Sequence, residues 1–242
     1  MKKYLLLFYS IVCYTVGLAV LAYYGLFLAE IPLFSEAEKT PALSPAGAAA
    51  VNLLLLLAFS LQHSLMARQP VKAALIRWIP KAAERSTYVL ISSVLLFALA
   101  WYWQRLPGEL YDFRGSAIGS TLWGLYGLGW AIGVASTFQI DHFHLFGLKQ
   151  AWFHLKDRST SNGTFRMPFL YRLVRPPINL GWLIIHWMTP HMTTDRLLMA
   201  AGFTVYIYIS MTYEERDLVR IFGDHYRQYK KQVPRLIPFS KK

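Results

Sequence analysis

The sequence has little charge and almost no cysteine. Charged residues make up 16% of the 242 residues, well below the roughly 25% that is usual for a soluble domain. Hydrophobic residues make up 55% of the chain. This balance excludes a disordered or collagen-like chain and indicates an integral membrane protein. The single cysteine, Cys13, excludes an intramolecular disulfide and a cysteine-rich metal site.

Acidic residues are also few. The chain has 25 Lys and Arg against 13 Asp and Glu, a formal net charge of +12. Such a charge is also found in nucleic-acid-binding proteins, but here the basic residues lie between apolar runs instead of forming one stripe. In that position they set the orientation of membrane helices. We therefore expect a lipid bilayer as a partner and no nucleic acid.

Four apolar runs are long enough for membrane helices. A hydrocarbon core of about 30 Å requires roughly 20 apolar residues per helix. The runs cover residues 4–28, 48–65, 87–103 and 118–138. The first run is too long for the hydrophobic part of a signal peptide, which has about 7–15 residues, so we expect a retained span.

Two further apolar segments are unequal in length. Residues 178–187 are too few to cross a bilayer at about 1.5 Å per residue, whereas residues 197–211 form a longer run. Together they predict a helical hairpin that turns near residues 190–194. The expected fold class is therefore an all-α integral membrane protein with about five spans and a short hairpin partner. Along the chain, segments rich in Lys and Arg alternate with segments of mixed charge. Because Lys and Arg are concentrated on the cytoplasmic side of membrane proteins, this alternation predicts that both termini are cytoplasmic.

Residues 175–181 read Arg-Pro-Pro-Ile-Asn-Leu-Gly and predict the start of a helix. Proline fits the first turn because its missing N–H would have no partner there. The free N–H groups of that turn can bind an anion, and Arg175 beside them can bind a carboxylate. Gly181 allows another backbone or a ligand to approach closely. The same residues also fit a plain helix start at the membrane surface with a snorkelling arginine.

Glu214 and Glu215 are adjacent carboxylates at the end of the last apolar run. A carboxylate at a membrane boundary raises the free energy of the folded protein unless a cationic partner lies beside it. We therefore expect either a side-chain cation or the ammonium group of a ligand beside them. The following residues, 222–238, are basic and aromatic and are expected to form a surface segment that faces water or lipid headgroups.

The stretch 141–147 contains His142 and His144, which point to different faces of a helix and cannot share a metal ion there. With no cysteine in this stretch and no clear third ligand, we predict no metal site. His63, at the end of the second run, is more often a structural polar residue than a catalytic one. Ser86 is expected to cap the third span.

At these motifs the chain resembles a known group of membrane enzymes. Residues 175–181, Glu214-Glu215 and the pattern Phe-Gly-x-x-Tyr-x-x-Tyr over 222–229 resemble the membrane methyltransferases typified by isoprenylcysteine carboxyl methyltransferase. The closer resemblance is to the methanethiol S-methyltransferase and NnrU-like branch. It rests on residues 62–66, 84–90, 142–148, 189–193 and 214–218.

The chain departs from the wider group's pattern, Arg-His-Pro-x-Tyr-x-Gly, at two positions. Pro176 replaces the histidine and Asn179 replaces the tyrosine. In this chain the backbone or other residues would have to provide the contacts that the histidine and the tyrosine make with the cofactor in the wider group. Tyr171 and His186 are candidates because they are near in sequence.

The resemblance implies S-adenosylmethionine as the cofactor and a small thiol as the methyl acceptor. It implies conversion of methanethiol to dimethyl sulfide, or of sulfide to methanethiol, by in-line attack of a thiolate. The implied cofactor-binding residues are Tyr171, Arg175, Pro177, Ile178, Asn179, Leu180, Gly181, His186, Tyr213, Glu214 and Glu215. Because a thiolate attacks better than a thiol, a base is useful. The catalytic candidates are Asp141, His142 and His144 as the base, with His63 and Arg85 as stabilisers of the anion.

Other acceptors and roles stay open. The same architecture resembles phospholipid and prenylcysteine methyltransferases, and NnrU-like proteins suggest a non-enzymatic accessory role. The resemblance implies one domain over 1–242, with N-terminal spans in 1–115 and a cofactor-binding half in 116–242 that has a cytoplasm-facing pocket. It also implies a multi-pass protein of a bacterial-type inner membrane, and it leaves the oligomeric state open.

Overall fold

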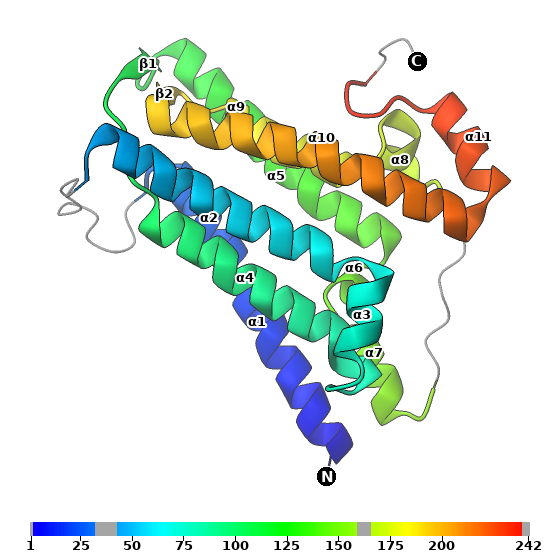
Figure 1. Ribbon diagram of the computed structural model, residues 1–242. Coiled ribbons are helices and arrows are strands. Elements are labelled where there is room, and N and C mark those ends of the chain that lie inside the picture. The colour runs from blue at the N-terminus through cyan, green and yellow to red at the C-terminus, as the bar shows by residue number, and fades with distance from the viewer. Residues whose placement is uncertain (1, 32–42, 159–165, 239–242) are drawn as a thin grey trace. The chain divides into compact units, whose positions relative to one another are not determined.

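The structure is a computed structural model that describes residues 2–31, 43–158 and 166–238, and helices dominate it (Figure 1). Two short strands, β1 (Glu109–Asp112) and β2 (His191–Thr193), pair antiparallel. The helices are α1 (Lys2–Leu28), α2 (Pro45–Met66), α3 (Gln69–Leu75), the 3₁₀ helix η1 (Lys81–Ala83), α4 (Glu84–Tyr102), α5 (Ala117–Ile140), α6 (His142–Leu145), α7 (Leu148–Leu155), α8 (Phe169–Leu173), α9 (Pro177–Trp187), α10 (Thr194–Phe222) and α11 (Asp224–Gln232).

Four helical stretches in the described part of the chain are long and apolar enough to cross a membrane. They are α1, α2, the stretch Lys81–Tyr102 made of η1 and α4, and α5. These are the four apolar runs that the sequence predicts. The all-α membrane class is confirmed, with the short β1–β2 ribbon as its exception. The fifth span stays a prediction.

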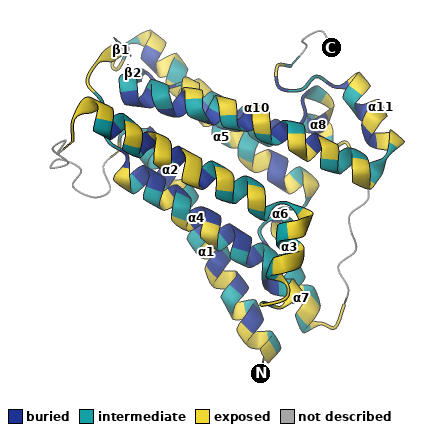
Figure 2. Cartoon of the chain, in the orientation of Figure 1, coloured by how far each residue is buried: buried dark blue, intermediate teal, exposed yellow. Residues whose placement is uncertain are grey.

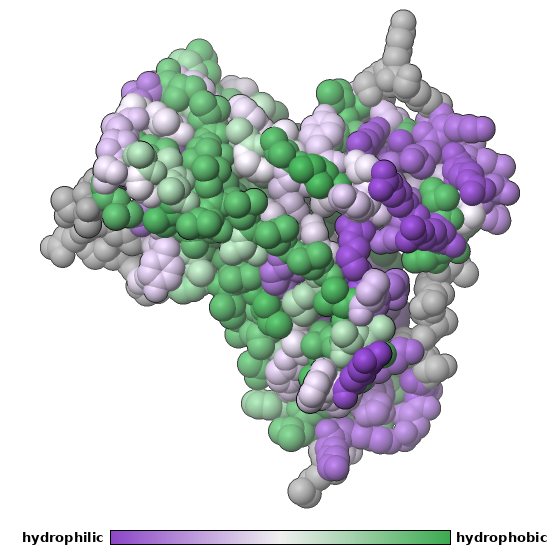
Figure 3. Space-filling model, in the orientation of Figure 1, coloured by the Kyte–Doolittle hydropathy of each residue, from purple (hydrophilic) through white to green (hydrophobic). Residues whose placement is uncertain are grey.

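The membrane helices carry large apolar side chains on their outer faces. Figure 2 shows exposed positions along α2, and Figure 3 shows hydrophobic side chains over the same helix. Leu54 and Leu61 of α2 and Phe138 of α5 each have 56–65% of their surface exposed. Monomeric soluble proteins rarely expose such large apolar patches. The exposed faces of these helices therefore fit contact with lipid tails.

Contacts divide the chain into two compact units. The first unit contains residues 1–106 and 142–162, and the second unit contains residues 107–141 and 163–242. In the first unit, α1 and α2 both pack against α4, and α7 packs against α1. Residues 142–158, which the sequence groups with the cofactor-binding half, thus belong with the N-terminal helices.

The start of α4 differs from the sequence prediction. The helix begins at Glu84, its N-cap residue is Ala83, and no side chain caps it. Ser86 lies inside the first turn, where its hydroxyl donates to Ser10 Oγ of α1 at 2.9 Å. The predicted cap is wrong because η1 leads directly into α4 and moves the helix start upstream of Ser86.

In the second unit, α5 and α9 approach closely at three glycines. A Cβ on Gly181 of α9 would lie 2.6 Å from the carbonyl oxygen of Gly129 and 2.9 Å from the amide nitrogen of Gly133, both on α5. Small residues at such positions allow helix backbones to touch. Of the two roles expected for Gly181, the close approach of another backbone is confirmed.

The predicted helical hairpin is also confirmed. The short helix α9 is followed by β2, near the predicted turn, and then by α10, which packs back on α9. However, α10 continues to Phe222, eleven residues beyond the predicted end at residue 211. Glu214 and Glu215 therefore lie inside a helix, and the chain turns only at Gly223, whose φ of +57° favours glycine.

Candidate functional site

A buried ion pair joins two of the predicted cofactor-binding residues in the second unit. Arg175 lies between α8 and α9, and Glu215 lies on α10. The Nη1 atom of Arg175 is 3.4 Å from Oε1 of Glu215, and about a tenth of each side chain is exposed, 10% and 9%. The Nζ atom of Lys230, on α11, lies 3.0 Å from the other oxygen, Oε2. Glu215 therefore has a cation beside each carboxylate oxygen.

The ion pair leaves hydrogen-bonding capacity unused. Within the described residues, Nε and Nη1 of Arg175 and Oε1 of Glu215 are buried and make no hydrogen bond. A buried polar group without a partner costs about 1–3 kcal/mol, more if it is charged. The arrangement is thus suited to a ligand that brings an acceptor to Arg175 and a donor to Glu215. The carboxylate and ammonium of an amino acid together meet both needs.

The backbone beside this pair has the predicted form. Helix α9 begins at Pro177, and Pro176 is its N-cap residue. Arg175 therefore immediately precedes a helix N-terminus, where the partial positive charge of the helix dipole favours an anion. Tyr171, on α8, is buried, and its hydroxyl has a pKa raised by burial and by the nearby Glu214 carboxylate.

The C-terminal segment does not form the predicted surface. Tyr226, Tyr229 and Val233 are buried in one apolar cluster, against which Leu218 and other residues of α10 pack. Their spacing of three and four residues places them on one helical face, while Lys231 is exposed on another. The prediction is wrong for the aromatic residues because the turn at Gly223 folds α11 back onto α10. Figure 1 shows α8 and α11 at the same end of α10.

Two buried tyrosines of α11 contribute to the electrostatics of the site. Burial raises the pKa of both hydroxyls. The Glu215 carboxylate raises them further, while the positive charge of Arg175 partly opposes the shift. Tyr226 and Tyr229 are therefore neutral hydrogen-bonding groups at any physiological pH and add no negative charge beside Arg175.

The other predicted cofactor residues are placed differently. Tyr213 is half exposed, and the guanidinium of Arg216 lies 5.5 Å from the centre of its ring. Glu214 is exposed, so Glu215 alone of the adjacent carboxylates forms the buried pair. On α9, Pro177 and Gly181 are buried, and Ile178, Asn179 and Leu180 are partly buried.

His186 lies near the far end of α9 in an aromatic stack. Its Nδ1 atom is 2.6 Å from the carbonyl oxygen of Trp182 and donates to it. Its ring centre is 4.4 Å from that of Phe203, on α10. The structure thus shows a buried histidine held between α9 and α10, more than one helical turn beyond Gly181.

In the first unit, Tyr88 joins the two predicted anion-stabilising residues. Its hydroxyl lies 2.8 Å from Nε2 of His63, and the guanidinium carbon of Arg85 lies 4.7 Å from the centre of its ring. Arg85 is held in turn by the carbonyl oxygen of Leu145, which accepts from its Nε at 2.6 Å. Tyr88 is not among the candidates predicted from the sequence. Its spacing of three residues from Arg85, on one helical face, is the signal that points to it.

His142 and His144 lie on the single turn of α6, and their environments differ. His142 is buried, and its Nε2 atom is 3.0 Å from the hydroxyl of Tyr14 on α1. Burial lowers the pKa of His142 and favours the neutral imidazole that a base requires. His144 is partly buried, and its carbonyl accepts from the side chain of Gln150. Asp141 follows α5 and belongs to the second unit.

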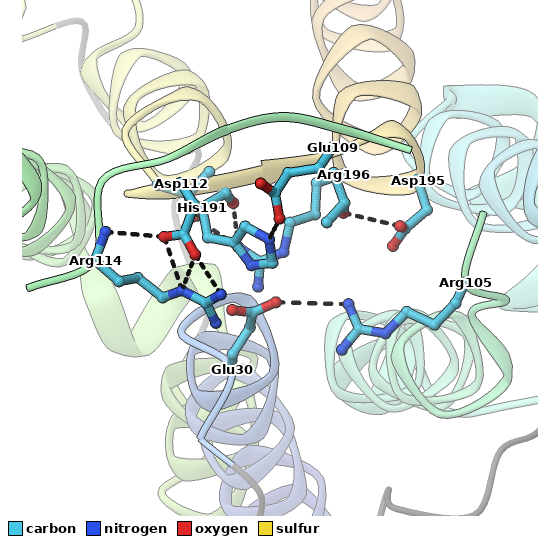
Figure 4. Close-up of polar contacts among 10 residues, drawn as sticks. Glu30, Arg105, Glu109, Asp112, Arg114, His191, Asp195 and Arg196 are labelled. Carbon is cyan, nitrogen blue, oxygen red and sulfur yellow. Dashed lines mark hydrogen bonds and ion pairs between the residues drawn. The ribbon is translucent and has the colours of Figure 1, made fainter. Parts of the chain in front are cut away.

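A further polar cluster lies on the β1–β2 ribbon (Figure 4). Glu109, Asp112 and His191 each offer one atom within 4.8 Å of the others, close enough to hold a metal ion. Each carboxylate already contacts a basic side chain. Arg114 binds Asp112 through hydrogen bonds that lower the pKa of that carboxyl to about 2, and His191 Nε2 lies 3.0 Å from Glu109. The cluster therefore combines a local ion pair, Asp112 with Arg114, and a contact that joins the two strands, Glu109 with His191.

Comparisons with known proteins give a consistent result over the whole chain. The chain is 41% identical over 239 residues to a methanethiol S-methyltransferase of Mycobacterium tuberculosis, covering 99% of this chain and 98% of the relative. It is 39% identical to methanethiol S-methyltransferase 1 of Bradyrhizobium diazoefficiens, covering 99% and 84%. It is 45% identical to methanethiol S-methyltransferase 2 of the same organism, covering 78% and 72%. No protein-family model and no solved structure matches the chain.

Proposed function

The chain belongs to the methanethiol S-methyltransferase family, and from this membership we propose that it transfers a methyl group from S-adenosylmethionine to the thiolate of methanethiol, forming dimethyl sulfide. S-adenosylmethionine supplies a methyl group on a sulfonium, which an aligned nucleophile can take. The buried pair of Arg175 and Glu215, with its unused donors and acceptor, is the observation that supports the choice of cofactor.

We assign the amino acid end of the cofactor to this pair. Arg175 Nε and Nη1 would donate to the carboxylate, assisted by the N-terminus of α9. Glu215 Oε1 would accept from the ammonium group. Hydrogen bonds to charged groups contribute about 1.5–3 kcal/mol each, so these contacts can account for selective binding of a zwitterion. Of the adjacent carboxylates, the buried Glu215 has this role and the exposed Glu214 does not.

We assign the base to His142, in preference to His144 and Asp141. Its neutral imidazole would take the proton from the thiol, and the freed electron pair on sulfur would form the new bond to the methyl carbon. The bond from that carbon to the sulfonium sulfur would break at the same time, with S-adenosylhomocysteine as the neutral leaving group. Burial keeps this imidazole neutral, and the Tyr14 hydroxyl holds its ring in place. Arg85, with Tyr88 and His63, remains the candidate for stabilising the thiolate.

The membrane setting agrees with this chemistry. Methanethiol is small and apolar, so it partitions into lipid, and the apolar helices would bring the enzyme to it. The cofactor is charged and soluble, which is consistent with a site at the cytoplasmic side of a multi-pass protein of a bacterial-type inner membrane. The distribution of Lys and Arg supports this orientation, with both termini cytoplasmic.

Headspace gas chromatography of the purified full chain in detergent tests the proposal. Dimethyl sulfide is expected only when both S-adenosylmethionine and methanethiol are supplied, and it should fall sharply in Arg175→Ala. Replacing methanethiol by sulfide tests the earlier methylation step. Calorimetric binding of S-adenosylmethionine without methylation of either thiol would contradict the acceptor and point to a phospholipid or prenylcysteine. Absence of both binding and product would contradict the proposal as a whole.

A further inference from the structure

We propose that Lys230 is a positioning residue of the cofactor site, which keeps the Arg175–Glu215 pair open for a ligand that carries an amino acid group. This inference rests on the proposed function and goes one step beyond it. It concerns a residue of α11, whose sequence predicted a basic and aromatic surface segment.

The two carboxylate oxygens of Glu215 have different contacts. Oε2 lies 3.0 Å from the Lys230 ammonium, at hydrogen-bonding distance. Oε1 lies 3.4 Å from Arg175 Nη1 but forms no hydrogen bond with it. The carboxylate is therefore held firmly on one side by Lys230 and only loosely on the other by Arg175.

An arginine and a carboxylate that are buried together would normally form two parallel hydrogen bonds. That arrangement would use Oε1 of Glu215 and two of the N–H donors of Arg175, and fewer groups would remain for a ligand. Here Lys230 holds Oε2 and so prevents the carboxylate from turning fully toward Arg175. Nε and Nη1 of Arg175 and Oε1 of Glu215 stay available as a result.

The charges support the same conclusion. Arg175, Lys230 and Glu215 together carry a net charge of +1, so the triad retains a positive charge for the carboxylate of a ligand. Without Lys230 the pair would be neutral. A desolvated pair of opposite charges has little further attraction for a zwitterion, because each charge is already compensated.

The position of Lys230 is itself fixed by its neighbour in the chain. The hydroxyl of Tyr229 donates to the carbonyl oxygen of Tyr171 at 2.7 Å and fastens α11 to α8. The N–H of Arg175 donates to the carbonyl oxygen of Pro234 at 3.2 Å, just beyond α11. These bonds hold α11 beside Arg175, so the flexible lysine side chain has a defined anchoring point.

The inference predicts a specific pattern of ligand selectivity. Lys230→Met should weaken binding of S-adenosylmethionine and S-adenosylhomocysteine about tenfold, the effect of losing one charge-assisted hydrogen bond. It should leave binding of 5′-methylthioadenosine unchanged, because that molecule has the nucleoside and the sulfur but no amino acid group. Lys230→Arg keeps the cation and should restore most of the affinity.

The experiment is isothermal titration calorimetry of the three ligands against the full chain in detergent. Lys231→Met is the matched control, because Lys231 is the next residue on the same helix and is exposed. It removes the same charge and should change every affinity by less than about twofold. Thermal unfolding of each variant shows whether the fold is retained, and Lys230→Arg provides the test if Lys230→Met does not fold.

Two outcomes would overturn the inference. Equal weakening of all three ligands by Lys230→Met would show a general loss of the site rather than a positioning role. Unchanged binding of S-adenosylmethionine would show that Glu215 does not need Lys230. Both outcomes differ from failure of the proposed function, in which the unaltered chain itself would not bind S-adenosylmethionine.

Discussion

The hydroxyl of Tyr229 donates a hydrogen bond of 2.7 Å to the main-chain carbonyl of Tyr171, and both residues are buried. This bond joins the C-terminal helix α11 to α8, which ends two residues before Arg175. A helix of nine residues has little stability of its own, so its position depends on such tertiary contacts.

Tyr229→Phe should therefore lower both stability and cofactor affinity. The substitution keeps the ring in its apolar cluster but leaves the Tyr171 carbonyl without its donor, at a cost of about 1–3 kcal/mol. We expect a lower unfolding temperature and weaker binding of S-adenosylmethionine, both measurable on the purified protein. Tyr213→Phe removes a hydroxyl from a half-exposed tyrosine and serves as the control. Equal effects of the two substitutions would contradict the assigned role of Tyr229.

Glu215→Gln should weaken binding of S-adenosylmethionine about tenfold or more. The substitution removes the negative charge that is expected to hold the ammonium group, and it leaves Arg175 and Lys230 without their anion. Glu214→Gln changes the adjacent, exposed carboxylate and should have a much smaller effect. Calorimetry on both variants distinguishes the two carboxylates. A larger loss in Glu214→Gln would mean that the exposed residue binds the cofactor.

The membrane helices and the start of α9 could be predicted because they depend on local properties. Apolar length determines a span, and two prolines after Arg175 determine a helix start. The hairpin of α9 and α10 followed from one short and one longer apolar run. These features need no knowledge of which distant residues meet.

The contacts that define the site could not be predicted in this way. Lys230 reaches Glu215 only because Gly223 adopts a positive φ and reverses the chain between α10 and α11. The contact between His191 and Glu109 arises from pairing of β1 with β2, because the two residues are 82 positions apart in the sequence. The spacing of Tyr226 and Tyr229 predicts that both residues lie on one inward face of α11. The basic residues beside them in the sequence favoured a surface segment instead.

Gly181→Ala should destabilise the second unit. A Cβ there would lie 2.6 Å from the backbone oxygen of Gly129, and a backbone atom cannot move aside as a flexible side chain can. Overpacking of this kind costs about 1–3 kcal/mol, so the unfolding temperature should fall. Gly124→Ala, on the partner helix α5, places its methyl group in open space and should not lower the unfolding temperature. A similar decrease in both variants would argue against close packing of α5 on α9.

The rate of methyl transfer should depend on pH through His142. Burial lowers the pKa of this histidine below its ordinary value of 6.5, so the neutral, proton-accepting form dominates at pH 7 and above. Activity should therefore be nearly constant in that range and should decrease only as the pH falls through the lowered pKa. This is the direction expected for a base that must be unprotonated.

The profile of kcat/KM from about pH 5 to about pH 9, with saturating S-adenosylmethionine, measures this dependence. His142→Ala should lower the rate and remove the decrease on the acid side, because no titrating imidazole remains at the base position. Tyr14→Phe keeps the imidazole but removes the hydroxyl 3.0 Å from Nε2, so it should shift the acid limb without abolishing it. If His142→Ala kept the unaltered rate and profile, the base would have to be another group. His144→Ala and Asp141→Asn, measured in the same series, would then identify which residue of the stretch takes the proton.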